Sequence, residues 1–202
     1  MRQLLRSTVV NGVLMLGLVS ASHAGTITFD FDTGSPSQTS TPFTYTLSGL
    51  TATFNAAGDP GSYSILNLSG FVTLSNNVLF SNPSGNAEDL TISFDSPLSS
   101  ISLNFATADS NPVTLTAMLG GNPLPNPDSE SGSGSPVEGV LGYSNTPFNS
   151  VLIQPTAGES NLAIDNITVT TAASSAPEPG SFLLGGGALA ILSLAMRRRR
   201  KA

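Results

Sequence analysis

Between residues 25 and 171 the chain consists of short runs in which apolar and polar residues alternate. In the clearest runs every second residue is Phe, Tyr, Leu, Ile, Val or Ala, and mostly Thr, Ser or Asp stands between; these runs are 27–31, 43–47, 90–94, 101–105 and 113–119. A period of two places successive side chains on opposite faces of a strand, so each run predicts a half-buried β-strand. We therefore expect an all-β body.

Clusters of turn-forming residues separate these runs. Pro and Gly interrupt the alternation at 59–61, 82–85 and 96–97, where each cluster predicts a turn between two strands. Short strands at this regular spacing favour a single β-sandwich of jelly-roll type over residues 25–171. Residues 122–139 are so rich in Pro, Gly and Ser that we expect a long loop without strands there.

Basic residues are confined to the two ends of the chain. All 7 Lys and Arg residues precede residue 7 or follow residue 196, the single His is His23, and Cys and Trp are absent. The body therefore lacks the side chains for a Ser-His-Asp triad, a Cys-His pair, a Schiff base or a His- or Cys-ligated zinc. Nucleic acid is also excluded as a partner, because its binding needs Lys and Arg to neutralise phosphates.

The N-terminal end has the layout of a secretory signal. Arg2 and Arg6 precede an apolar run at 9–19, and small residues at Ser22 and Ala24 fit a cleavage site. We expect residues 1–24 to be a signal peptide, with an uncleaved membrane anchor as the alternative, and we expect the body to be exported.

The C-terminal end carries a second signal of three parts. A linker at 172–176 leads to Pro177, Glu178 and Pro179, and residues 181–196 form an uncharged, mostly apolar segment. The basic cluster that follows is Arg197, Arg198, Arg199, Arg200 and Lys201. The apolar segment predicts a short transmembrane helix, and the basic cluster predicts a cytoplasmic stop signal. In this order, the parts of segment 177–202 resemble the PEP-CTERM sorting domain of Gram-negative bacteria.

This resemblance implies a route to the cell surface. It implies that exosortase, a membrane transpeptidase-like enzyme, recognises Pro177, Glu178 and Pro179 and removes the helix. The precursor would be anchored in the inner membrane, and the product would reach the cell surface or an exopolysaccharide (biofilm) matrix. The alternative is a plain membrane-anchored adhesion module that keeps its tail.

The last apolar run contains a change of phase. Leu162 and Ile164 share one face, but Ile167 and Val169 continue the pattern one residue out of step, which predicts a β-bulge at Asp165 and the residue after it. The Ile-Asp-Asn-Ile-x-Val sequence is similar to the closing strand of many jelly-roll carbohydrate-binding and adhesion modules.

That second resemblance implies a structural calcium ion. Asp165 is then the leading ligand, and Asp30 or Asp32 supplies another. Calcium takes oxygen ligands, which suits a body without His or Cys. The alternative is that Asp165 stabilises a turn and that the other two are solvated charges on a strand.

The remaining chemistry favours a protein without catalytic activity. Glu88 and Asp89, together with Asp95, could form the carboxylate pair of a glycoside hydrolase, but the chain has no Trp and only 3 Tyr to stack on sugar rings. We expect a non-enzymatic surface or matrix protein that binds polysaccharide or builds matrix. The alternative is a secreted carboxylate-dependent glycoside hydrolase.

Overall fold

The structure is a computed structural model that describes residues 25–32, 39–58, 61–81, 87–158 and 161–173. Every regular element in these ranges is a β-strand, so the expected all-β class is confirmed. The strands are β1 Thr26–Phe29, β2 Phe43–Leu47, β3 Leu50–Ala56, β4 Tyr63–Asn67, β5 Asn77–Ser81, β6 Leu90–Thr107, β7 Val113–Leu119, β8 Asn122–Pro123, β9 Asp128–Glu130, β10 Val137–Pro155 and β11 Leu162–Thr171.

The expected signal peptide 1–24 and the expected sorting segment 177–202 lie outside the described residues. Among the residues that are described, no helix is long and apolar enough to cross a membrane.

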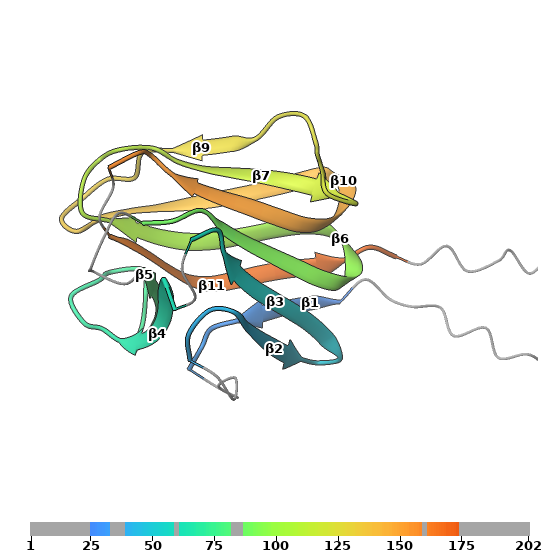
Figure 1. Cartoon of the computed structure of the whole chain (residues 1–202), viewed down its shortest axis with the longest axis horizontal. Coiled ribbons are helices and arrows are strands. Elements are labelled where there is room, and N and C mark those ends of the chain that lie inside the picture. The colour runs from blue at the N-terminus through green and yellow to red at the C-terminus, as the bar shows by residue number, and fades with distance from the viewer. Residues whose placement is uncertain (1–24, 33–38, 59–60, 82–86, 159–160, 174–202) are drawn as a thin grey trace, which may run out of the picture. The chain divides into compact units, whose positions relative to one another are not determined.

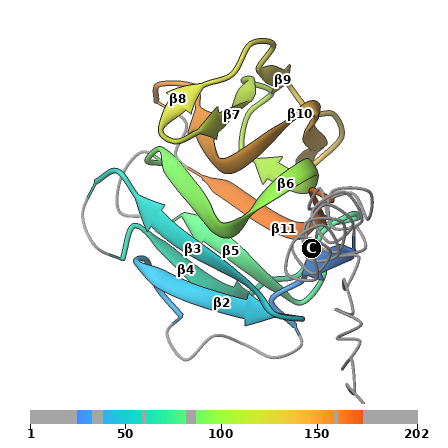
Figure 2. The ribbon, with the colours of Figure 1, turned by 90° about the vertical axis from the view of Figure 1, so that its right-hand side faces the viewer.

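Two long strands, β6 and β10, connect two sets of antiparallel strands. The first half of β6 pairs with β3 and with the second half of β10, which also pairs with β7. The second half of β6 pairs with β11 and with the first half of β10, while β1 and β5 pair with β11. In Figure 2 the hairpin β2–β3 and the strands β7–β9 lie on opposite sides of β6.

One cluster of buried side chains lies between the two sets of strands. It contains the alternating apolar residues of the predicted runs, for example Ile92 and Phe94 of β6 and Leu115 of β7. Aromatic rings make up much of it: Phe43 and Phe54 stack with ring centroids 4.7 Å apart. The alternation in the sequence thus becomes the buried face of each strand, which is the main source of stability in a chain without disulfides.

Two expectations about turns were wrong. Residues 96–97 do not separate two strands, because β6 runs through them and changes partners there. A proline is tolerated where a strand bends and its ladder is interrupted. Residues 122–139 hold β8, β9 and the start of β10, since long-range pairing with β7 and β6 outweighs their turn-rich composition.

The second half of β6 has a face that points away from this core, here called the outer face. Residues directly opposite each other on paired strands share a face, and the register aligns β10, β6 and β11 in four rows. The rows are Glu138–Ala106–Ala163, Val140–Asn104–Asp165, Gly142–Ser102–Thr168 and Ser144–Ser100–Thr170. Figure 1 shows the three strands running alongside each other.

A loop between β4 and β5, residues 68–76, covers the first two rows. Its Leu74 is buried with Val78, Ala106 and Ala163 in a second, smaller apolar cluster. Leu68 and Phe71 pack on the same cluster. The last two rows are not covered by this loop, so the outer face has a covered half and an open half.

Candidate functional site

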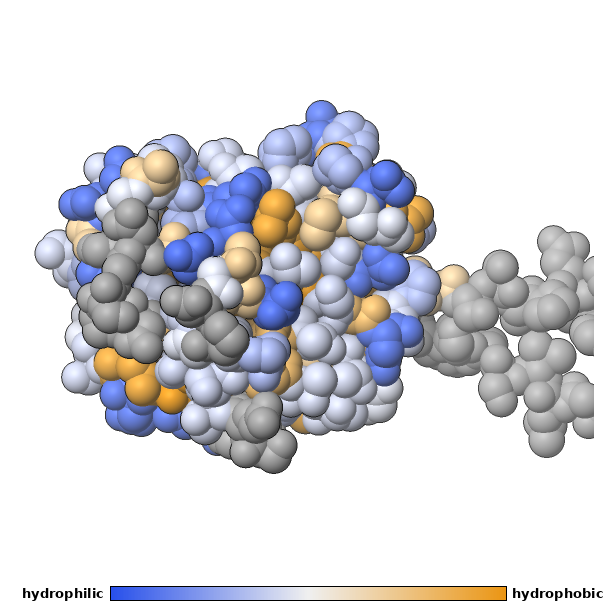
Figure 3. Space-filling view, viewed as in Figure 1, coloured by the Kyte–Doolittle hydropathy of each residue, from blue (hydrophilic) through white to orange (hydrophobic). Residues whose placement is uncertain are grey.

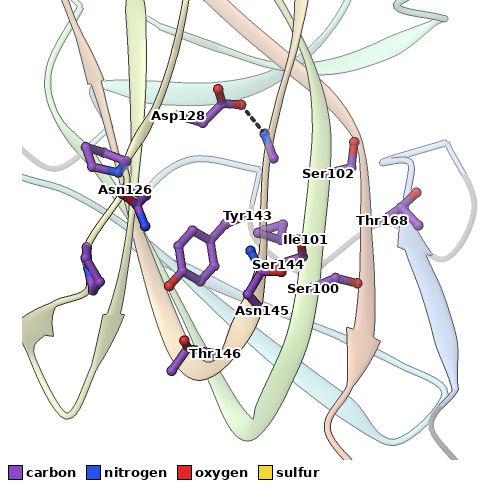
Figure 4. A pocket seen from close by; sticks show the side chains of 13 residues that line it. Ser100, Ile101, Ser102, Asn126, Asp128, Tyr143, Ser144, Asn145, Thr146 and Thr168 are labelled. Atoms are coloured by element: carbon purple, nitrogen blue, oxygen red, sulfur yellow. Dashed lines mark hydrogen bonds between the residues drawn. The ribbon is translucent and has the colours of Figure 1, made fainter.

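The open half of the outer face forms the floor of a pocket of about 540 Å³. This volume is in the range typical of ligand pockets. The floor consists of the last two rows without Thr170. The walls come from the loop between β8 and β9 and from the bend in β10; together the lining is Ser100, Ile101, Ser102, Pro125, Asn126, Pro127, Asp128, Gly142, Tyr143, Ser144, Asn145, Thr146 and Thr168 (Figure 4).

Hydroxyl and amide groups dominate this lining. The Thr168 hydroxyl hydrogen-bonds the Thr28 hydroxyl at 2.9 Å, and Asp128 accepts one hydrogen bond. The other polar side chains of the pocket make no hydrogen bond within the described part of the chain; they are Ser100, Ser102, Asn126, Tyr143, Ser144, Asn145 and Thr146. A cavity with this lining presents donors and acceptors to a ligand rich in hydroxyl groups.

Tyr143 is the exception among these unpartnered side chains because it is buried. Only 9% of its surface is exposed, and its ring packs edge-on against Phe148 with centroids 5.5 Å apart. Figure 4 shows the ring in the pocket with its hydroxyl directed to the side where Thr146 lies. By contrast, the buried Tyr63 donates its hydroxyl to the Glu88 carbonyl at 2.6 Å. A buried hydroxyl without a protein partner requires water or a ligand.

Two asparagines of the pocket have left-handed backbone conformations. Asn126 has φ of 61° and Asn145 has φ of 100°. Asn145 lies where the pairing of β10 with β6 shifts register, between Ser144 and Phe148. Non-glycine residues with positive φ are uncommon and concentrate at functional sites, so the bend in β10 presents Asn145 at an energetic cost.

Asp128 fixes the wall of the pocket to its floor. Its Oδ2 accepts a hydrogen bond from the Gly142 N–H at 2.7 Å, drawn as a dashed line in Figure 4. The backbone at Gly142 is close to its neighbour, because an added Cβ would lie 3.1 Å from the Ile101 carbonyl oxygen. Glycine therefore keeps this part of the floor low.

The covered half of the outer face is held by carboxylates. Glu138 Oε1 accepts the Val72 N–H at 2.7 Å, and its Oε2 accepts the Thr73 N–H at 2.6 Å and the Thr73 hydroxyl. Burial raises the pKa of Glu138, but these hydrogen bonds lower it more, so the pKa lies below its ordinary value. Asn104 and Asn166 also bond this loop, each donating to the Thr73 carbonyl.

Asp165 is fully buried beneath the same loop. Its Oδ2 accepts the Ser75 N–H at 3.0 Å, and its Oδ1 accepts the Asn166 N–H at 2.7 Å. Burial, opposed by these bonds and assisted by the charges of Asp32 and Asp30, raises the pKa of Asp165 to about 6. The predicted bulge is confirmed, because the register with β6 shifts after Asp165 and Asn166 has φ of 51°.

The structure brings the three expected calcium ligands into one region. Asp32 accepts the Asn77 N–H at 2.8 Å, Asp30 accepts the Asp32 N–H at 3.2 Å, and both carboxylates influence Asp165. In the described ranges, however, no group of three or more acidic, His or Cys side chains is arranged as a metal site. Calcium stays a prediction.

The acids considered for a glycoside hydrolase lie elsewhere. Asp89 accepts the Gln154 amide at 2.9 Å, and Asp95 accepts the Thr51 N–H at 3.2 Å. Neither these acids nor Glu88 line the pocket. The sorting residues Pro177, Glu178 and Pro179 and the basic cluster 197–201 lie outside the described residues.

The sequence analysis did not identify Tyr143, Asn126 or Asn145 as site residues. The available signal was Asn followed at once or one residue later by Pro, at Asn126 and Asn145, because Asn tolerates the left-handed conformation that sharp bends need. The exposed hydrophobic residues gave no competing surface: Figure 3 shows small separate hydrophobic areas on the face it displays.

Comparison with known proteins gives limited similarities. No family model and no curated protein matches the chain. A mutant of a family 29 carbohydrate binding module is 16% identical, with 77% of this chain and all of that chain covered and a TM-score of 0.39. The cleaved adhesin domain of Lys-gingipain is 12% identical, with 73% of this chain and all of that chain covered and a TM-score of 0.43. TM-scores below 0.5 carry no argument about ligand or activity.

Proposed function

We propose that this chain is a non-enzymatic exported protein of the cell surface or extracellular matrix of a Gram-negative bacterium. Its body, a β-sandwich of jelly-roll type, binds polysaccharide in the pocket on the open half of the outer face. The observation that carries the proposal is the buried Tyr143 hydroxyl, which has no partner in the described structure and lies in a pocket of unpartnered hydroxyl and amide groups. A sugar chain supplies matching hydroxyl groups along its length.

The pocket chemistry also indicates weak, reversible binding. All three tyrosines of the chain are buried, at 2%, 0% and 9% exposure, so none offers an open ring for stacking under a sugar. Hydrogen bonds to an open surface contribute modestly, because each replaces a hydrogen bond to water. Repeated units of a polysaccharide can compensate through multivalent attachment when many copies lie in a matrix.

A panel of immobilised polysaccharides tests this binding. We expect the full chain, purified in mild detergent, to be retained on some of the panel and to release no reducing sugar. The Ser102→Leu variant, which fills the exposed floor of the pocket, should lose retention. Released sugar would support the glycoside hydrolase instead, and equal retention of the variant would place binding elsewhere.

Export by exosortase is the second part of the proposal. It rests on the order of the signal peptide, the Pro177–Pro179 motif, the apolar segment and the basic cluster in the sequence. Exosortase and the membrane are the partners during processing. Mass spectrometry of protein recovered from the cell surface tests it: the C-terminal arginine cluster should be missing. An intact C-terminus through Ala202 would indicate a plain anchored module.

A further inference from the structure

Asp128 is the only charged residue among the thirteen that line the pocket. One of its carboxylate oxygens, Oδ2, is occupied by the Gly142 N–H. Its Oδ1 accepts no hydrogen bond from the described part of the chain. The pocket therefore offers one carboxylate oxygen for a ligand group that carries hydrogen.

No cationic side chain of the body can neutralise this carboxylate. From residue 25 to residue 196 the sequence has no Lys, Arg or His, whereas all acids except Glu178 lie between residues 25 and 171. The field around the pocket is therefore negative. Such a field repels uronic acids and sulfated sugars and attracts a cationic group.

The rest of the lining narrows the kind of cation. Hydroxyl and amide side chains surround Asp128, and they match a ligand that has hydroxyl groups beside its positive charge. An amino sugar with a free amine has both, because its ammonium group is separated from the ring hydroxyls by one or two bonds. An ammonium–carboxylate hydrogen bond is stronger than a bond between neutral groups.

We propose that the pocket prefers polysaccharides with free primary amines, with the Asp128 carboxylate binding the ammonium group. This inference rests on the proposed function, since it names the class of sugar that the same pocket binds. Neutral sugars bind through the hydroxyl and amide groups alone, and acidic sugars are repelled.

The test compares hexamers of glucosamine and of N-acetylglucosamine, which differ in the charge of the amine. We expect the full chain, purified in mild detergent, to bind the glucosamine hexamer at least tenfold more tightly. Asp128→Asn should remove this preference and leave binding of the acetylated hexamer within about twofold, because the Asn oxygen can still accept the Gly142 N–H. Asp109→Asn is the matched control: it removes one exposed charge outside the pocket and should keep the preference.

Each outcome separates the two proposals. Equal affinity for both hexamers, or a preference that survives Asp128→Asn, overturns the amine proposal and leaves polysaccharide binding standing. Absence of binding to these hexamers and to the whole polysaccharide panel overturns both. Displacement of the glucosamine hexamer by tetralysine at equal concentration would show that the pocket recognises ammonium charge without the sugar, and it would also overturn the proposal.

Discussion

The two halves of the outer face differ in how their polar groups are used. In the covered half, Glu138 and Asp165 accept hydrogen bonds from the backbone of the loop at 68–76, and Asn104 donates to the same loop. In the open half, the hydroxyl of Tyr143 and the amide of Asn145 have no partner in the described structure. Both halves lie on the same three strands.

This difference indicates what each half does. Carboxylates buried under a loop with all their bonds satisfied hold the protein's own chain in place. Unpartnered groups around a cavity, one of them buried, are available to a molecule from outside. Changes in the covered half should therefore alter stability, and changes in the open half should alter binding.

The largest expected effect is on stability in the covered half. Glu138→Ala removes the acceptor of three hydrogen bonds from Val72 and Thr73, so we expect a loss of about 2–4 kcal/mol in the free energy of unfolding. Denaturant unfolding measures it. Glu130→Ala, which removes an exposed acid of β9, should change stability by less than about 0.5 kcal/mol. Similar losses in both variants would contradict the role of the loop contacts.

A pH effect should follow from Asp165. Its pKa is about 6 in the folded protein against an ordinary value of 3.8, so between pH 4 and 6 the folded state binds more protons than the unfolded state. The contribution of Asp165 to the free energy of unfolding should therefore rise as pH falls from 7 to 4, by on the order of 1–3 kcal/mol.

Asp165→Asn should remove this dependence. The variant is expected to be less sensitive to pH between 4 and 7 than the wild type, as measured by thermal unfolding in a pH series. The contribution of Glu138 has the opposite sign and a lower window: because its folded pKa is depressed, its stabilisation is lost only as pH falls through that value, below 4.5. An unchanged profile in the Asp165 variant would show that its burial is not the cause.

Two tyrosines provide a matched pair of variants for the comparison. Tyr143→Phe should weaken polysaccharide binding about tenfold, or about 1.4 kcal/mol, and leave stability within about 0.5 kcal/mol, because its hydroxyl has no protein partner. Tyr63→Phe should cost about 1 kcal/mol of stability, because the Glu88 carbonyl loses its donor, and leave affinity unchanged. The reverse pattern would assign the two hydroxyls wrongly.

The smallest expected effect concerns calcium. If Asp165, Asp30 and Asp32 bind the ion, calcium should raise the melting temperature more than sodium chloride of equal ionic strength. The extra stabilisation should be about 1 kcal/mol when calcium exceeds its dissociation constant several-fold, and Asp165→Asn should remove it. Equal shifts in the two salts would leave Asp165 as a support of the loop alone.

The sequence predicted the local features of the fold well. The alternation at 43–47 appears as β2, and the change of phase at 162–169 appears as the bulge after Asp165. Both features depend on which side of one strand is buried, and a local pattern contains that information.

The pocket could not be predicted in the same way. It unites residues at 100–102, 125–128 and 142–146 with Thr168, and only the register of β10 and β11 on β6 brings them together. Local patterns do not specify which strands pair. For the same reason Glu138, at the end of an expected loop, gave no sign that it would hold a loop more than sixty residues earlier.

The most direct test of the account follows backbone amide signals by NMR while an oligosaccharide retained in the panel is added. We expect the shifts to concentrate at residues 100–102, 126–128 and 142–146 and at Thr168, and to leave residues 68–77 unchanged. That result would show that the open half binds and the covered half does not. Shifts centred on residues 68–77, or on a surface remote from the pocket, would contradict the account.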